Sequence, residues 1–353
     1  MTTQSNPARG GTWRRDPETG ELTRTGWTEP RPAARPSGPA APGVEASYAE
    51  QAPEGLPWSP TDAMLVSNAR FRIDRDVIPR GNLRGHLGGD EHLVGTRRAE
   101  IEFDVEFTPA GGADTVPPWG ILMRACGMAE TVTAAEYVTY TPVSGGFESI
   151  VLRYAIDGVV YYSRGARGNV RIMMNAYEVP KLQFRFMGFD TFAAADTPNS
   201  PDFSAWERPL VVKDANTGTV QLGGALWGGA GWAGGGTELA SRGLEIDLGN
   251  RLSHVKLLGG ESIDIVDRET TGRTTVALSA ADEVQWRTDI NNHVLTGVGF
   301  NMGTVAGARI TAWMPSVQRI DPQATDYEGR VMMQTELRVL PVDGNDELTL
   351  VTR

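Results

Sequence analysis

The sequence predicts a mainly β protein: an extended, Pro-rich N-terminal arm followed by two tandem β-sandwich or β-barrel domains, each with one flanking α-helix. Three observations lead to this prediction. From residue 58 onward, apolar and polar residues alternate with a period of two, which is typical of strands with one buried face. One helical pattern interrupts the strands in each half of the chain. The length of 353 residues also suits about two domains of ~100 to 200 residues each.

The arm comprises residues 1–57. It holds nine of the 22 prolines and almost no Val, Ile or Phe, so it cannot bury enough apolar surface to fold alone. We therefore expect a flexible or extended segment. Trp13 and Trp27 lie in it. Because interfaces favour aromatic side chains, these two are either anchors that dock on a partner or solvent-exposed side chains.

The first domain is expected to span residues 58–200. Its clearest strand is RRAEIEFDVEF, in which a buried apolar set alternates with an acidic row: Ala99, Ile101, Phe103, Val105 and Phe107 against Glu100, Glu102, Asp104 and Glu106. Further strands are expected at 149–156, 159–164, 169–174 and 181–189. Asp157-Gly158 predicts a tight hairpin turn between the first two of these, because this dipeptide tolerates positive φ.

The helix of this domain is expected to begin at Pro117-Pro118, since proline suits the first helical turn, and to end near Gly127. Cys126 falls on its apolar side. With no histidine nearby in the sequence, this thiol is expected to be a buried small side chain rather than a nucleophile. As the one cysteine, it also excludes a disulfide or a thiolate metal cluster within the chain.

The second domain is expected to span residues 201–353. Its strands are predicted at 207–214, 219–224, 243–250, 253–258, 261–266, 273–279, 308–314, 329–340 and 347–351. Its helix is predicted at 280–291, where Ser279 and Asp282 form a capping-box-like start. Segments 165–189 and 305–341 share one order: glycine, basic strand, a turn near proline, alternating strand. This order favours a duplicated domain of about 130 to 150 residues, with chance similarity between β-rich segments as the alternative.

The net charge of −11 argues against a protein that holds nucleic acid by neutralising phosphates. Most of the excess, −7, lies in residues 201–353. No run approaches ~18 apolar residues, so a membrane span is not expected, and the N-terminus lacks the apolar core of a secretory signal. These features predict a soluble protein of the cytoplasm, or one that is assembled there.

Motifs for chemistry are scarce, and we expect no catalytic, cofactor-binding or metal site. Residues 229–234 match G-x-G-x-x-G, but they lie in a Gly-rich loop (222–236) with no helical pattern after it. We expect this loop to pack on a neighbouring subunit or ring. His86, Asp90, Glu91 and His92 offer metal-ligand types, although surface polarity is the expected explanation.

Several of these patterns together resemble the tail tube (major tail) proteins of long-tailed bacteriophages. The first half carries ETVTAAEYVTYTPVSGGFESIVLRYAIDGVVYYSRGARGNV, a short turn and PKLQFRFMG. The second half carries GLEIDLGN, IVDRETTGRTTVALS, a helix and YEGRVMMQTELRVLPVDGNDELTLV, and is similar to the second tube domain of the longer members. The resemblance covers about residues 60–353 and leaves the arm unexplained.

The resemblance implies a structural virion protein, not an enzyme, that self-assembles into stacked rings. The rings form the siphophage-like tail tube that conducts DNA from capsid to host during genome ejection. With two tube domains per chain, homotrimers of pseudo-sixfold symmetry are expected, and otherwise hexamers. The implied partners are further copies of the chain, the tape measure protein, the tail terminator and distal tail proteins. DNA passes without tight binding, and assembly takes place in the cytoplasm of the bacterial host.

The acidic row Glu100, Glu102, Asp104 and Glu106 is a candidate lumen wall that repels phosphates, with a solvated outer face as the alternative. Candidate inter-subunit contacts are Arg164, Arg167, Arg171, Trp227, Trp232, Trp13 and Trp27. The arginines are expected to pair with the acidic second domain of a neighbour. Two other functions stay open: a capsid-decorating or host-binding virion protein, and a carbohydrate-active β-sandwich enzyme.

Overall fold

The computed structural model describes residues 59–82, 85, 87–190, 200–213, 217–226, 236–258 and 260–353, and the backbone alone of strand residues 4–5, 12–15, 22–26, 44–47, 194–195, 227 and 231–232. Two compact units divide the chain, Met1–Arg35 and Pro36–Arg353. The first unit contains a three-stranded antiparallel sheet of β1 (Gln4–Ser5), β2 (Thr12–Arg15) and β3 (Leu22–Gly26).

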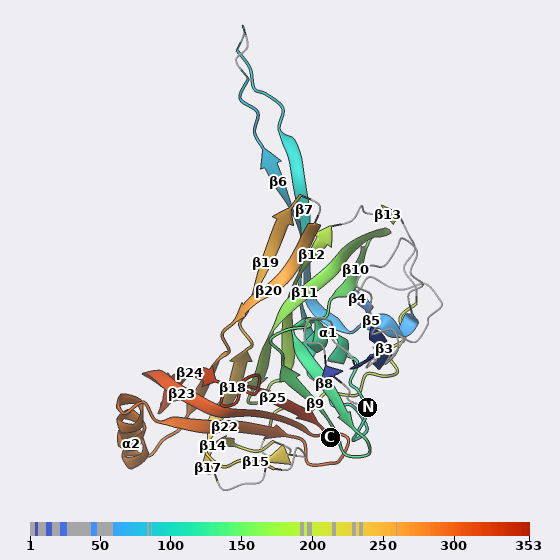
Figure 1. The fold of residues 1–353 in the computed structure, drawn as a ribbon. Coiled ribbons are helices and arrows are strands. Elements are labelled where there is room, and N and C mark those ends of the chain that lie inside the picture. Colours follow the sequence, from blue (N-terminus) through green and yellow to red (C-terminus); the bar gives the residue numbers. More distant parts are fainter. Residues whose placement is uncertain are drawn as a thin grey trace. The chain divides into compact units, whose positions relative to one another are not determined.

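Among the residues described with their side chains, strands make up 57% and helices 8%, with two α-helices, which confirms the predicted mainly β class. The first part of the second unit contains β4 (Val44–Ser47), a 3-10 turn (Pro60–Asp62), β5 (Ala63–Met64), β6 (Val66–Ile78), β7 (Leu93–Glu106), α1 (Gly120–Ala125), β8 (Met128–Thr133), β9 (Tyr137–Pro142), β10 (Ile150–Ile156), β11 (Val159–Asn175), β12 (Lys181–Asp190) and β13 (Ala194–Ala195) (Figure 1).

The rest of this unit contains β14 (Val220–Leu222), β15 (Leu226–Trp227), β16 (Gly231–Trp232), β17 (Thr237–Leu239), β18 (Ser241–Asp247), β19 (Asn250–Leu257), β20 (Gly260–Arg268), β21 (Thr271–Val276), α2 (Ala280–Asn291), β22 (Leu295–Met302), β23 (Ile310–Tyr327), β24 (Arg330–Leu340) and β25 (Thr349–Thr352). Strands β15 and β16 pair as a two-stranded hairpin, and so do β19 and β20.

Eight long strands form one continuous antiparallel sheet in the order β6-β7-β12-β11-β18-β21-β24-β23. The two halves of the chain each contribute four strands. Both follow the same path: a hairpin, a helix, and then two long antiparallel strands that return beside the hairpin. The halves meet where β11 pairs with β18. Whether 58–200 and 201–353 are separate domains, as the sequence suggests, stays a prediction.

The apolar face of this sheet is buried. Every apolar residue of the predicted β7 set, from Ala99 to Phe107, is at most 1% exposed. They pack with Phe184 and Phe186 of β12 and with Leu122 of α1 in a core that also contains Leu337 of β24. One core therefore spans both halves of the chain.

Local turn chemistry follows the sequence closely in the first half. Asp157 and Gly158 both have positive φ, 47° and 75°, and Ile156 pairs with Val159, so the predicted hairpin turn is confirmed. The prediction of two strands at 159–164 and 169–174 is wrong in one respect, because β11 runs through both. Gly165, with φ of 57°, lies at a register shift rather than at a turn, so the strand bends without ending.

Two strand predictions fail in the second half. Residues 207–213 form no strand, because Val212 makes only two backbone bonds, with Tyr177 and Glu178, instead of a ladder. Strand β22, which the sequence analysis did not find, has two glycines that interrupt its alternating pattern. Strand β23 extends to Tyr327, well beyond the predicted end at 314.

The two helices lie where they were predicted. Helix α1 is shorter than expected because it begins at Gly120 and not at Pro117-Pro118, while it ends near Gly127, as predicted, where φ is 77° and β8 follows at once. Cys126 is fully buried, and burial raises the pKa of its thiol well above the usual range, as expected of an inert side chain. Helix α2 starts at Ser279, whose side chain accepts a hydrogen bond from the Asp282 backbone N–H, and lies against β23 (Figure 1).

Candidate functional site

The second face of the eight-stranded sheet carries charged side chains from nearly every strand, and we call it the charge-bearing face. Cross-strand partners share a face, so the register defines its members. Its cations include Arg70, Arg72, Arg98, Arg164, Arg167, Arg171, Lys181, Arg185, Arg273, Arg330 and Arg338. Its anions include Asp74, Glu100, Glu102, Asp104, Glu106, Glu245, Asp247 and Glu336. Both signs of charge therefore occur on this face in both halves of the sheet.

On the first-half strands the charges form a network. Glu100 lies within 3.5 Å of Arg72 on β6 and of Arg185 on β12, so it bridges three strands. Arg185 also reaches Glu102 at 3.4 Å. The hydrogen bond from Arg98, assisted by the charge of Arg72, holds the pKa of Asp74 below its usual range. Because opposite charges alternate from strand to strand, every carboxylate named here has a cation beside it.

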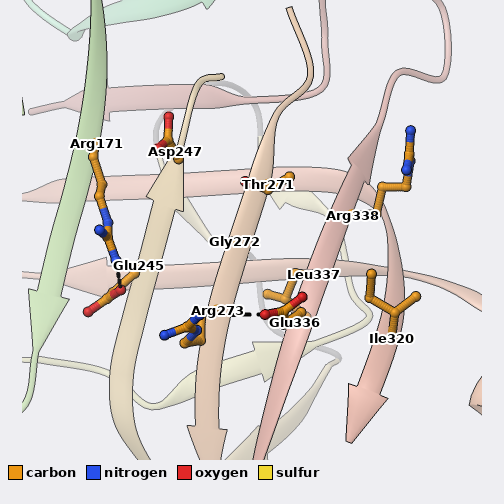
Figure 2. Close-up of a pocket in the computed structure, with 10 residues that line it drawn as sticks. All are labelled: Arg171, Glu245, Asp247, Thr271, Gly272, Arg273, Ile320, Glu336, Leu337 and Arg338. Atoms are coloured by element: carbon orange, nitrogen blue, oxygen red, sulfur yellow. Dashed lines mark hydrogen bonds and ion pairs between the residues drawn. The ribbon is translucent and has the colours of Figure 1, made fainter. Parts of the chain in front are cut away.

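The second-half strands continue the pattern. Figure 2 shows Arg171 reaching Glu245 across the joint between the halves, and Arg273 reaching Glu336, at 2.5 and 3.5 Å. These four residues line a depression of about 220 Å³ over β11, β18, β21, β24 and β23. Its other lining residues are Asp247, Thr271, Gly272, Ile320, Leu337 and Arg338. The depression is lined by paired charges rather than by an apolar wall with a few polar groups, so it lacks the chemistry of a small-molecule pocket.

In several ion pairs of this face the cation is more exposed than its carboxylate. The Arg72 side chain is 65% exposed against 10% for Glu100, and Lys181 is 37% exposed against 9% for Asp104. Arg171 and Glu245 differ in the same direction, at 40% and 24%, whereas Arg273 and Glu336 are equally exposed, at 49% and 48%. Around Glu100 and Asp104 the outermost groups are therefore guanidinium and ammonium groups held by carboxylates.

The joint between the halves is also built from polar side chains. Asn169 of β11 donates to Asp247 of β18 at 2.8 Å, and its carbonyl oxygen accepts from the backbone N–H of Asn250. The buried Asn250 amide donates to the carbonyls of Cys126 and Gly168, at 2.6 and 3.0 Å. This network fixes the register of β11 against β18.

Each end of the eight-stranded sheet has an edge. Within the part of the chain that the structure describes, β6 pairs only with β7. In the same described part, the terminal stretch of β23, from Ile320 to Tyr327, pairs only with β24. Unpaired N–H and C=O groups on edges of this length are sites for pairing with another chain.

Two hairpins extend from the sheet in the same sense, β6–β7 and β19–β20 (Figure 1). Lys256 of β19 pairs with Asp76 of β6, which ties them together. That bond, with a second one from Thr96, lowers the pKa of Asp76. Both hairpins expose apolar residues: Val77, Ile78, Leu93 and Val94 on the first, where its two strands end before the 79–92 connection, and Leu257 and Leu258 at the turn of the second.

The predicted acidic row does lie on one face, opposite the core. The cations beside it, which come from the flanking strands, were not predicted. Glu100 and Asp104 are only 8% and 6% exposed, and Arg72, Arg185 and Lys181 from the flanking strands neutralise much of the row. Alternation within β6 and β12 was the available signal, since Arg72 and Arg185 occupy the polar positions of those strands. That the row faces a lumen stays a prediction.

The predicted contact residues have different outcomes. Arg167 bonds Asp264 at 3.0 Å, and Arg171 bonds Glu245, so these arginines do meet acidic second-half residues, but within their own chain. Arg164 lies half-buried on β11 opposite Phe189. Trp27, His86 and the side chains of Trp13, Trp227 and Trp232 lie outside the described residues. Contacts of these residues with a neighbouring subunit stay a prediction.

Across the described ranges, no group of three or more His, Cys, Asp or Glu side chains is placed to hold a metal ion. Among the helices described, none is long and apolar enough to cross a membrane.

A family model described as phage tail tube protein matches residues 32–342, which include both halves of the eight-stranded sheet. No curated protein matches the chain.

Proposed function

Because the chain belongs to the phage tail tube protein family, a family of structural virion proteins, we propose that its copies form rings that stack into the hollow tail tube. DNA passes through this tube from capsid to host. The proposed location is the virion tail, assembled in the host cytoplasm together with tape measure, terminator and distal tail proteins. The chain acts by assembly and not by catalysis.

The observation that carries the ring proposal is the joint between β11 and β18. This joint connects two four-stranded half-sheets that follow the same path, and it satisfies the edge of each half with the other. The outer edges lie on β6 and on residues 320–327 of β23. Strand β6 has the same place in its half-sheet as β18, and β23 has the same place as β11. Pairing β23 of one chain with β6 of the next repeats the internal joint and removes both edges.

Charge favours this pairing. The edge segment 68–75 of β6 carries three arginines, Arg70, Arg72 and Arg75, and one carboxylate, Asp74, whereas the edge segment of β23 carries Asp321 and Asp326. Opposite charges across a strand pair stabilise it, and like charges disfavour pairing of either edge with itself.

Three chains with eight strands each would close a barrel of about 24 strands, with six half-sheets around the axis. The apolar face of the sheet is covered by α1, β8–β10 and β22, and this thicker layer fits the outside of a closed barrel. The charge-bearing face then lines the lumen. The exposed apolar residues of the two hairpins are proposed as contacts with the next ring, since exposed apolar groups gain from burial at an interface.

A disulfide experiment tests the joint. Arg72 and Gln323 lie at the centres of the two edge segments, so the double variant Arg72→Cys/Gln323→Cys should form chain-to-chain disulfides when assembled chains are oxidised. We expect a non-reducing gel to show dimers and a dominant covalent trimer. The native Cys126 is buried and does not interfere. The control Arg72→Cys/Gln334→Cys moves one cysteine a strand inward, because Gln334 pairs with Gln323, and should stay monomeric.

Electron microscopy of the same samples tests the assembly itself. Hollow tubes with a regular axial repeat support the proposed function, and dispersed monomers under all conditions contradict it. If tubes form and the double variant stays monomeric on the gel, the β6–β23 joint is wrong. A covalent hexamer in place of a trimer would contradict the three-chain ring.

A further inference from the structure

We propose that the carboxylates of the charge-bearing face act as fixed counterions, which keep its exposed arginines from binding the phosphates of passing duplex DNA. This inference rests on the proposed function, which places that face in the lumen. An acidic wall would exclude DNA by repulsion. Here, instead, carboxylates of the same sheet face neutralise the arginines that a phosphate would otherwise bind.

The order of exposure is the first argument. On an acidic wall the carboxylates would be outermost. On this face Arg72 and Arg185 are 65% and 59% exposed, above a Glu100 side chain that is 10% exposed. A phosphate that approaches the sheet meets guanidinium groups first, and arginine is the side chain best suited to bind phosphate in two-point geometry.

The pairing is the second argument. A cation binds DNA productively when it releases a counterion condensed on the phosphates. Arg171, Arg185 and Arg273 already have carboxylate partners at 2.5, 3.4 and 3.5 Å, in Glu245, Glu102 and Glu336. To bind a phosphate each arginine must give up or share that partner, so the net gain is small. Because cations and carboxylates are paired across the face, their charges largely cancel in each pair and leave a weaker local field to hold the polyanion.

The proposal depends on three carboxylates that each pair with an exposed arginine. Glu102, Glu245 and Glu336 each belong to a different strand, β7, β18 and β24, and each holds one arginine. Replacing them with glutamine keeps the size and a hydrogen-bond acceptor while it removes the charge. Arg171 and Arg273 then lose the carboxylate partners named above, and Arg185 keeps only Glu100, at 3.5 Å. The loss of three carboxylates from one continuous face should convert it into a DNA-binding surface.

The test measures binding of a labelled duplex DNA of about 20 base pairs by the unassembled full-length chain, in which this face is accessible. At about 50 mM salt we expect no measurable binding by the wild-type chain. The variant Glu102→Gln/Glu245→Gln/Glu336→Gln should bind at least about tenfold more tightly, with a slope of about −2 to −3 in log affinity against log salt, as three phosphate contacts require.

The matched control is Glu136→Gln/Glu238→Gln/Asp343→Asn, which removes three exposed carboxylates elsewhere and changes the net charge equally. It should not bind. Equal binding by both triple variants would overturn the proposal, because bulk charge would then explain the effect. Binding by the wild-type chain, or none by a folded face variant, would also overturn it.

Circular dichroism establishes whether the face variant folds. If it does not, Glu102→Gln/Glu336→Gln replaces it, because both of these side chains are almost half exposed, and its slope should be about −2. Tube formation by the wild-type chain needs no DNA, and DNA binding by the unassembled chain needs no tube. Failure here is therefore distinguishable from failure of the proposed function.

Discussion

The two halves of the long sheet follow one path and are stabilised in different ways, which the two helices show best. Helix α1 is embedded in the main core: Leu122, Met123 and Ala125 are fully buried. Helix α2 is twice as long, and Trp286 is its one buried residue, in a small separate cluster with Leu239, Val276 and Met333.

Helix α2 is attached mainly by polar contacts of Arg319 and Trp286, which we call the clamp. Arg319 of β23 stacks on the Trp286 ring at 4.4 Å and pairs with Asp289 at 2.9 Å, while the indole N–H donates to Thr335. The two halves therefore repeat the order of their elements, but different interactions stabilise their helices. Hydrophobic burial dominates under the first half-sheet, and a directed polar contact secures the helix of the second.

The largest effect is expected in the first helix. Leu122→Ala removes a fully buried side chain and should lower the free energy of unfolding by about 2 to 5 kcal/mol, measured by urea denaturation. The matched change in the second helix, Val284→Ala, removes a side chain that is 67% exposed and should change it by less than about 0.5 kcal/mol. Similar losses for both variants would remove the distinction between the helices.

A smaller effect is expected at the bend between β18 and β19, where the β19–β20 hairpin begins. Gly249, with φ of 71°, turns the chain from β18 into β19, and a Cβ there would collide with the carbonyl of Glu269. Gly249→Ala should cost about 2 to 4 kcal/mol, from backbone strain plus the clash. Gly158→Ala shares the positive φ at an open turn and should cost less. An equal melting temperature for the two variants would show that the bend tolerates a side chain.

The smallest effect of the three concerns the clamp on α2. Arg319→Ala should cost about 2 kcal/mol, because it removes both the stack on Trp286 and the partner of Asp289. Arg319→Lys keeps the charge but loses the planar stack, so we expect roughly half of that loss. The control Arg287→Ala breaks an exposed pair with Glu283 and should have almost no effect. Thermal unfolding of all three variants is the measurement; a wild-type melting temperature for Arg319→Ala would refute the clamp.

Much of the fold is predictable because local signals agree with the tertiary structure. The alternation in β7, the Asp157-Gly158 turn and the Ser279 cap each specify geometry over a few residues. Predictions fail where distant partners decide. Val212 has strand-like neighbours in sequence, but its available partners are the turn residues Tyr177 and Glu178, and no ladder forms.

The candidate site was only half predictable for the same reason. A single strand reveals which side chains share a face, so the acidic row of β7 was found. The neighbours of that strand depend on sheet order, and β12, which supplies Lys181 and Arg185, follows β7 in the chain by more than 70 residues. The local pattern therefore predicted an acidic face, while the register shows one on which cations from neighbouring strands lie beside the carboxylates.

The joint between β11 and β18 has a kinetic consequence. It forms inside one chain, so its probability does not depend on protein concentration, and each folded copy arrives with that contact complete. In the proposed ring, half of the six seams between half-sheets are then unimolecular. Closing the ring requires three seams between chains instead of six, so two encounters between chains precede closure instead of five. Nucleation of the tube should accordingly show a lower reaction order than it would for an equivalent assembly of single half-sheets.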